Sequence, residues 1–397
     1  MALVRSWADA SQVPFWDHEV PGSGLDSERG CVVADLERYR QAGSLDAVPR
    51  DITNVEAIIQ WLEDRGLSFD EVCDGLKDEE VLRVVRNLLE NIGSALSLRE
   101  ISERSGVSLE VLREVRIAAG LEPVTDDDRV YVESDVEAFT TLRLGSDLFS
   151  REELLSFIRV VGSSMSRVAD AANSLFHGDV ERPLMAAGAS ITEMMRRTAE
   201  AQDLALSLTS VLRMMMRQHL SQSIERHQRA FAGISRQGLM MPMAVGFIDL
   251  VGFTPLSADL DPQQLSDVVS RFEATANDTI TTLGGRLVKL IGDEVMFVAV
   301  DPADGCRIAA GLLERFGADR DLNPRGGMAY GPVLARGGDY FGPTVNLAAR
   351  LVDQAVPGEV LLTDELATRA PMPVEPGGRR MLKGFVDPVS VASLSSP

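Results

Sequence analysis

Two short motifs, each with an aspartate where an apolar stretch ends, constrain this chain more than any other feature of its sequence. The first motif reads FIDLVGFT at residues 247–254, and the second reads KLIGDE at residues 289–294. Since apolar strands end at the edge of a sheet, we expect Asp249 and Asp293 to lie at strand ends. Two carboxylates side by side form a binding site for divalent metal ions. The pattern therefore indicates chemistry on phosphoryl groups.

The order of elements around these motifs predicts the fold of the C-terminal part. After Gly238 the pattern changes to strands that alternate with helices. We expect strands over 244–250, 286–291, 294–300 and 325–330, and helices over 262–283, 304–316 and 345–355. This order predicts an α+β fold with a ferredoxin-like βαββαβ core. In that core Asp249 ends the first strand and Asp293 occupies a hairpin tip, so neighbouring strands bring the two carboxylates together.

The chemistry of the pair favours particular cations. Ligands that are all oxygen suit Mg²⁺ or Mn²⁺, which keep water and phosphate oxygens as their other ligands. A turn aspartate without function would be the simpler interpretation of either residue alone, but not of the pair with its flanking sequence. The turn that follows Asp249 has free backbone N–H groups at Gly252, Phe253 and Thr254, which suit phosphate oxygens, and Gly252 allows close approach.

The rest of the chain divides by its periodicity. We expect a loosely ordered arm over 1–45, a helical domain over 46–210, a linker helix over 211–240 and the α+β domain over 241–397. An all-α region thus precedes the α+β domain.

Residues 98–112 have the pattern of a helix-turn-helix, with Gly106 at the turn and Ser108 as the N-cap of the second helix. DNA recognition would need basic and amide groups on that second helix. The helix instead carries Glu110 and Glu114 beside its arginines. The pattern therefore favours structural helix packing over DNA binding.

The composition excludes several classes of partner. A formal net charge of -21 opposes binding to nucleic acid or to an anionic membrane surface. The three cysteines are far apart, which argues against a disulfide scaffold or a thiolate zinc site. No apolar run approaches the roughly 20 residues that span a bilayer, and the N-terminus lacks the features of a signal peptide. We expect a soluble, cytoplasmic protein that neither inserts into a membrane nor binds nucleic acid.

Two features of the helical part leave alternatives open. The methionine groups at 194–195 and 214–216 are typical of core filling, but a Met-rich cavity could also hold a lipid-like effector. His219 and His227 lie eight positions apart, on roughly the same helix face. They are typical of solvated surface histidines, although their titration range also suits a pH-sensing linker.

A third motif makes the resemblance to a known family specific. Residues 338–350 read GDYFGPTVNLAAR. Together with the two aspartate motifs, this segment resembles the catalytic domain of class III nucleotidyl cyclases, over about Met243 to Leu394. The resemblance implies that Asp249, Asp293 and the backbone carbonyl of Leu250 hold two Mg²⁺ or Mn²⁺ ions in each active site.

The resemblance also assigns the substrate contacts. It implies that Lys289 and Asp339 recognise the purine, since an ammonium that donates to N1 and a carboxylate that accepts from the N6 amino group select adenine. ATP is therefore the implied substrate, and cyclic AMP and pyrophosphate are the implied products. Asn346 would orient the ribose, Arg350 would meet the charge on the transferring phosphate, and Lys383 would bind the terminal phosphate. In the family the metal aspartates come from one subunit and the other contacts from its partner, which implies a homodimer with shared active sites.

The N-terminal region is similar, more loosely, to the autoinhibitory domain of the mycobacterial pH-regulated adenylyl cyclases. The similarity lies in Trp61-Leu62-Glu63 followed by Gly66, in residues 99–102 and in the Met-rich linker helix. It implies regulation of the catalytic domain, with a small molecule or a proton as the effector.

Three other interpretations compete with this one. Residues 337–341 superficially resemble the motif of diguanylate cyclases, but that motif belongs at a hairpin tip, which here is Gly292-Asp293. The chain could also be a DNA-binding regulator whose cyclase-like domain senses a nucleotide, or a nonproductive pseudo-cyclase. The complete set of metal and phosphate residues opposes both.

Overall fold

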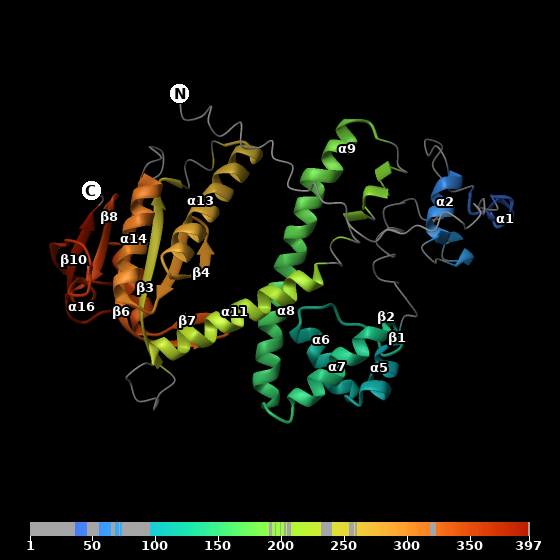
Figure 1. Ribbon diagram of the computed structural model, residues 1–397, viewed down its shortest axis with the longest axis horizontal. Helices are drawn as coiled ribbons and strands as arrows, with labels where there is room; N and C mark the ends of the chain where they lie inside the picture. Colours follow the sequence, from blue (N-terminus) through green and yellow to red (C-terminus); the bar gives the residue numbers. More distant parts are fainter. Residues whose placement is uncertain are drawn as a thin grey trace. The chain divides into compact units, whose positions relative to one another are not determined.

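The computed structural model divides into two compact units, one of Met1–Ser94 with Asn173–Asp203 and one of Ala95–Ala172 with Leu204–Pro397 (Figure 1). The structure describes residues 36–45, 55–64, 68–70, 72–73, 96–189, 193–194, 196–198, 200–201, 204, 208–231, 240–253, 258, 260–317 and 323–395. Most of the predicted N-terminal arm lies outside these residues. Among the described helices, none combines the length and the apolarity that crossing a membrane requires.

The N-terminal half is largely helical, as predicted, with one small sheet. Its described elements are α1 (Leu36–Gln41), α2 (Val55–Asp64), β1 (Leu96–Ser97), α5 (Leu98–Ser105), α6 (Leu109–Ala118), β2 (Arg129–Tyr131), α7 (Glu133–Gly145), α8 (Arg151–Phe176), the π-helical turn η2 (His177–Glu181), α9 (Arg182–Ala186) and the linker helix α11 (Thr209–Ala230). Strands β1 and β2 pair antiparallel. The segment 211–240, predicted as a linker helix, contains α11, which begins at Thr209 and ends at Ala230, while Met240 begins β3. The role of α11 as a linker stays a prediction. His219 and His227 are exposed on this helix, and their role as pH sensors stays a prediction.

Helices α5 and α6 form the predicted helix-turn-helix. Gly106 adopts φ 71°, the left-handed conformation that ends α5, and the side chain of Ser108 caps α6. Arginine side chains of this motif pair with carboxylates of the same chain. Arg113 makes a bidentate ion pair with Asp126. Arg151 of α8 pairs in turn with Glu110 and Glu114 of α6. With its charges matched internally, α6 lacks the free basic face that DNA would need, which supports the structural interpretation.

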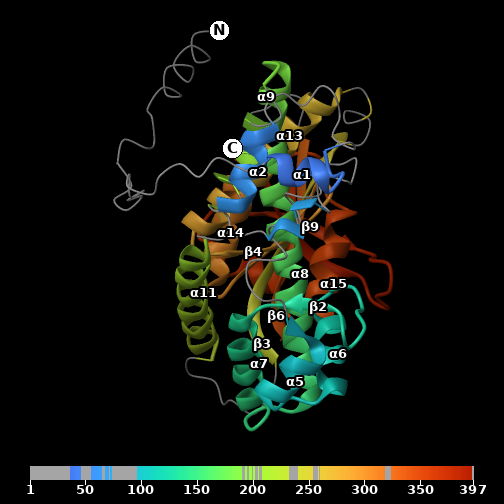
Figure 2. The same ribbon diagram turned by 90° about the vertical axis from the view of Figure 1, so that its right-hand side faces the viewer.

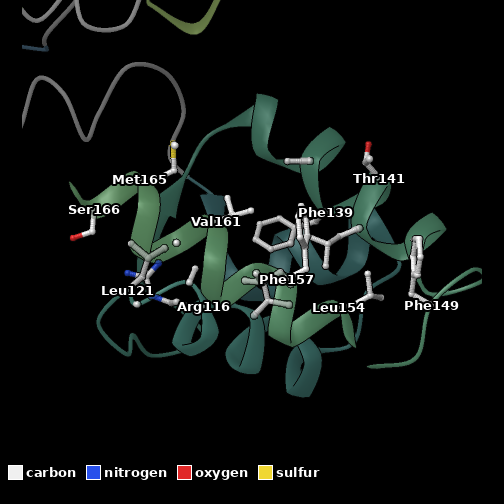
Figure 3. A pocket seen from close by; sticks show the side chains of 18 of the residues that line it. Arg116, Leu121, Phe139, Thr141, Phe149, Leu154, Phe157, Val161, Met165 and Ser166 are labelled. Atoms are coloured by element: carbon white, nitrogen blue, oxygen red, sulfur yellow. The ribbon is translucent and has the colours of Figure 1, made fainter. Parts of the chain in front are cut away.

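An apolar cavity of about 1150 Å³ lies between α6, α7 and α8 (Figure 3). Phe139, Leu154, Phe157 and Val161 point into it, and Arg116 lies at its edge. Met165 is the one methionine among its lining residues, so the cavity is lined mainly by aromatic and branched side chains. Methionines 214–216 are exposed on α11, so their interpretation as core filling is wrong, and Met194 is half-buried. Met195 lies outside the described residues. A lipid-like effector stays a prediction.

The C-terminal part contains the predicted ferredoxin-like core. Its elements are β3 (Met240–Val251), α13 (Pro262–Thr282), β4 (Arg286–Ile291), β5 (Glu294–Ala299), α14 (Pro302–Gly317) and β6 (Asn323–Arg336). Beyond the core lie β7 (Asp339–Phe341), α15 (Pro343–Val352), β8 (Glu359–Thr363), α16 (Asp364–Ala367), β9 (Glu375–Arg380) and β10 (Val389–Ser395). The strands run in the order β4-β5-β3-β6-β8-β10-β9, and β7 pairs with β6. The βαββαβ core is confirmed, while β7 to β10 extend the sheet beyond it.

The alternation of side chains along β3 decides which face of the sheet each residue occupies. Ala244, Ile248 and Leu250 are buried in the core beneath α13 and α14. The intervening Val245 and Phe247 pack toward α15 on the opposite face. Figure 2 shows α14 and α15 on either side of the strands. Asp249 lies two positions after Phe247 and four after Val245, so its side chain is on the same face of the sheet as theirs, the face that α15 covers.

Candidate active site

The two predicted metal-binding aspartates meet at one corner of the sheet. Asp249 lies opposite Glu294 in the register of β3 and β5, and Asp293 precedes Glu294 in the tight turn between β4 and β5. Gly292 makes this turn possible, since it adopts φ 64°. The N–H of Leu250 donates to the carbonyl oxygen of Asp293 at 3.3 Å, which fixes the strand end against the hairpin tip. The predicted juxtaposition of the two strand ends is confirmed.

Negative charge accumulates at this corner. Burial raises the pKa of Asp293, and repulsion from Asp249 raises it further. Burial also raises the pKa of Glu294 to about 7, with contributions from the charges of Asp249 and Asp353. Partly buried carboxylates that repel one another would be stabilised by a cation between them. The donor chemistry of the corner therefore fits a divalent metal ion.

The corner would leave most of the coordination of such an ion to other molecules. Among the described residues, no group of three His, Cys, Asp or Glu side chains converges on one point. The protein would thus supply Asp249, Asp293 and the Leu250 carbonyl. Mg²⁺ commonly binds through one or two carboxylates and completes its shell with water and substrate phosphates.

Arg325 completes the corner, and it was not predicted from the sequence. It lies on β6 directly opposite Asp249, 76 positions away in sequence. Its Nε and Nη2 atoms donate to Asp249 Oδ2 at 3.0 and 2.9 Å. No local sequence signal points to this partner, because only the register of β3 with β6 brings the two residues together. A guanidinium next to a predicted metal-binding carboxylate is also well placed for a phosphate oxygen.

The two predicted purine-binding residues contact each other. Lys289 Nζ of β4 donates to Asp339 Oδ2 of β7 at 2.5 Å, and both side chains are half-buried. The other carboxylate oxygen of Asp339 accepts the N–H of Tyr340 at 2.8 Å. The tertiary structure therefore holds a donor and an acceptor side by side, as recognition of one base edge requires.

The remaining predicted residues, Asn346, Arg350 and Lys383, come from segments that follow the βαββαβ core. Asn346 and Arg350 are exposed on α15, and Arg350 pairs weakly with Asp353 at 3.7 Å. Lys383 is exposed between β9 and β10, beside the buried Leu382. Within the described part of the chain, no hydrogen bond or ion pair connects these three side chains with Asp249 or Asp293. The inner face of α15 is fixed by close packing, because a Cβ at Gly327 of β6 would collide with the backbone at Ala348.

The turn after Asp249 is described only in part. Gly252 adopts φ 91° and has open space around it, while the ring of Phe253 packs against the core. Thr254 lies outside the described residues. The open side of Gly252 agrees with close approach of a ligand to its N–H group.

Comparisons with known proteins divide the chain in two. Residues 42–227 match the family described as adenylate cyclase regulatory domain, and residues 238–372 match the adenylate and guanylate cyclase catalytic domain. The pH-sensitive adenylate cyclase MT1302 of Mycobacterium tuberculosis is 31% identical over 78% of this chain and 78% of its own length. An adenylate cyclase of Glutamicibacter nicotianae is 33% identical over 66% of this chain and 68% of its own length.

Solved structures match the C-terminal part. The adenylyl cyclase CyaB from P. aeruginosa is 23% identical, covers 39% of this chain and 94% of its own, and has a TM-score of 0.37. The guanylyl cyclase Cya2 is 23% identical, covers 40% of this chain and 93% of its own, and has a TM-score of 0.36.

Proposed function

Since the chain belongs to the adenylate cyclases that join a regulatory domain to a class III catalytic domain, we propose that it converts ATP to 3′,5′-cyclic AMP and pyrophosphate. The observation that carries this proposal is the meeting of Asp249 and Asp293 at one corner of the sheet, with Arg325 beside them. The corner is acidic, partly buried and flanked by backbone N–H groups. It suits the triphosphate of a nucleotide together with divalent cations.

The reaction forms one bond and breaks another at the α-phosphorus. The ribose 3′-oxygen attacks, its proton is lost, and the bond to the bridging oxygen breaks as pyrophosphate leaves. Asp249, Asp293 and the Leu250 carbonyl would hold two Mg²⁺ or Mn²⁺ ions, which would supply positive charge to the phosphates and to the attacking oxygen. Asn346 would orient the ribose, and Arg350 would stabilise charge on the transferring group. Lys383, Arg325 and the N–H groups of Gly252, Phe253 and Thr254 would hold the other phosphate oxygens.

The ion pair of Lys289 and Asp339 supports the choice of ATP over GTP. Adenine presents an acceptor at N1 and a donor at N6, which match an ammonium and a carboxylate. Guanine presents a donor at N1 and an acceptor at O6. The ammonium of Lys289 would then face a donor and the carboxylate of Asp339 an acceptor, so both hydrogen bonds would be lost.

Changing this pair should change the base preference. We expect Lys289→Glu with Asp339→Asn to lower the ratio of ATP to GTP turnover by about tenfold or more, because glutamate accepts from guanine N1–H and the amide donates to O6. Turnover of each nucleotide with Mn²⁺ measures the ratio. If the ratio of ATP to GTP turnover is unchanged in a variant that unfolds at the wild-type temperature, Lys289 and Asp339 do not recognise the base.

We further propose that the active enzyme is a homodimer with two shared sites. Arg350 and Asn346 are exposed and make no contact with the aspartate corner within the described chain. A second copy could bring its own α15 to this corner, which would complete the site in a symmetric pair. A monomer should then be inactive.

The helical domain would regulate the catalytic domain by inhibiting it. The catalytic domain buries its own two cores, one on each face of the sheet, so a fragment of residues 238–397 should fold. The long helices α8 and α11 expose apolar side chains such as Phe157 and Leu220, and these could pack differently in active and inactive states. The apolar cavity of Figure 3, with Arg116 at its edge, would suit a fatty acid as effector.

Removing the helical domain should raise the activity. We expect the fragment of residues 238–397 to form cyclic AMP about 5- to 150-fold faster than the full chain, the range that corresponds to typical coupling free energies between domains. Rates measured across pH and across protein concentrations, above the point where dimers form, provide the comparison. A long-chain fatty acid should alter only the full chain. Equal rates for both proteins would exclude autoinhibition.

A further inference from the structure

A second, smaller pocket lies where the linker helix reaches the catalytic sheet. Its volume is about 230 Å³, and it is bounded by the end of α11, the start of β3, β4 and the turn between β6 and β7. The side chains that give it its character are Arg226, His227, Arg286, Arg336 and Tyr340. They come from three segments that are far apart in sequence: the end of α11, the start of β4, and the hairpin of β6 and β7. The tertiary structure thus gathers basic groups in a protein whose formal net charge is -21.

The positive charges in this pocket are not matched by carboxylates. Asp339 is the one acidic residue among the lining residues, and its two oxygens accept from Lys289 and from the Tyr340 N–H. Arg286 donates instead to neutral groups, the Tyr340 hydroxyl at 3.2 Å and the Gly338 carbonyl at 2.8 Å. Within the described part of the chain, no ion pair involves Arg226, Arg286 or Arg336. The pocket therefore carries uncompensated positive charge.

Two arginines of the pocket, Arg226 and Arg286, lie close to each other. Arg226 is half-buried and lies close enough to Arg286 and Tyr340 for their charges to act on it. Burial, and then repulsion from Arg286, lowers the pKa of Arg226. Both arginines stay protonated at neutral pH, because the ordinary pKa of arginine is far above 7. Their mutual repulsion would be relieved by an anion bound between them.

The size and the donors of the pocket define the ligand. A volume of about 230 Å³ is below the roughly 300–1,000 Å³ of pockets that hold drug-sized molecules. Planar guanidinium forks from different elements suit a tetrahedral anion with several acceptor oxygens. We propose that this pocket is a binding site for a phosphate-type anion, such as inorganic phosphate or pyrophosphate, outside the catalytic corner.

An anion in this pocket would connect the linker helix to the purine-binding strand. It would hold Arg226 of α11 and Arg286 of β4 together, and Arg286 already donates to the hydroxyl of Tyr340, the residue after Asp339. Occupancy would thus fix the end of α11 relative to the strand that carries Asp339. Binding is independent of the proposed function, whereas any effect on turnover rests on it.

Direct titration tests the site without any reaction. The full chain, free of nucleotide and metal, is titrated with inorganic phosphate and separately with pyrophosphate, and binding is followed by calorimetry and by phosphorus NMR. We expect saturable binding of at least one anion, weakened by about tenfold or more in Arg226→Gln and in Arg336→Gln. The matched control is Arg217→Gln, on the exposed face of the same helix, which should bind as the wild type does.

A further variant separates this site from the catalytic one. Binding should persist in Lys383→Ala with Arg325→Ala, which removes two of the proposed contacts to the substrate phosphates. Absence of saturable binding in the wild type would overturn the proposal. So would binding that is lost in this double variant but unchanged in Arg226→Gln. Thermal unfolding of each variant shows whether the protein is folded, and failure to form cyclic AMP would not affect any of these results.

Discussion

Replacing Asp249 with asparagine should lower the rate of cyclic AMP formation by roughly 10²–10³-fold or more, because the variant loses one of the two carboxylates that would hold the cations. The amide keeps the size and shape of the side chain but not its charge. A steady-state assay with saturating ATP and Mn²⁺ measures the rate. Binding of Mn²⁺, followed by electron paramagnetic resonance in the absence of nucleotide, should weaken in parallel.

The structure indicates that this variant will remain folded. The ion pair between Asp249 and Arg325 is lost, but both side chains are partly exposed, so the cost should not exceed about 1 kcal/mol. Loss of the Asp249 charge also removes part of the repulsion that raises the pKa of Asp293 and Glu294. Around neutral pH this relief stabilises the folded state, because it favours the ionised carboxylates. Thermal unfolding measures the balance.

A matched substitution shows whether the effect belongs to the site. Asp278→Asn makes the same chemical change on the exposed face of α13. It should leave both turnover and Mn²⁺ binding at the wild-type level. If Asp249→Asn kept more than a tenth of the wild-type rate, the metal assignment and the enzyme mechanism built on it would both be wrong.

Two inactive variants should restore activity when they form a mixed dimer. Co-expression of an Asp249→Asn chain with an Arg350→Ala chain, each with a different affinity tag, allows purification of dimers that contain one copy of each. In such a dimer one site carries both defects and the other carries none. We therefore expect about half of the wild-type activity per dimer, while either variant alone is nearly inactive.

The control for this experiment places both defects in the same set of residues. A mixed dimer of Asp249→Asn with Asp293→Asn chains has one damaged metal corner in each site, so it should recover nothing. If the first mixed dimer stayed inactive while its purification showed both chains, the aspartate corner and Arg350 would have to act within one chain. The shared-site dimer would then be excluded.

The sequence predicted the core of the catalytic domain well, because its signals are local. Alternating apolar residues defined β3 to β5, and the Gly292-Asp293 turn placed the hairpin between Arg286–Ile291 and Glu294–Ala299. The helix-turn-helix was predicted for the same reason, from Gly106 and Ser108. The strands β7 to β10 lie beyond the βαββαβ pattern and were not predicted. For β8 the reason is that no tight turn joins it to either of its partners, β6 and β10.

Features that depend on distant segments could not be derived from the sequence. Arg325 follows Pro324 without any local sign of its partner, and only the register of β3 with β6 places it against Asp249. The basic pocket was missed because its arginines come from α11, β4 and β6. Methionines 214–216 were expected to fill a core but are exposed, since methionine clusters show composition and not which side chains face inward.

By itself the sequence determined which chemical groups stand at strand ends, turns and helix faces, since backbone periodicity and turn preferences act over a few residues. It placed the acidic pair at the strand ends, whereas the roles expected of Lys289, Asp339, Asn346 and Arg350 came from the family resemblance. The tertiary structure decided which of these groups touch: Lys289 meets Asp339 across 50 positions and Arg325 meets Asp249 across 76. Such contacts arise from strand register and core packing, which depend on the whole chain and not on any one segment.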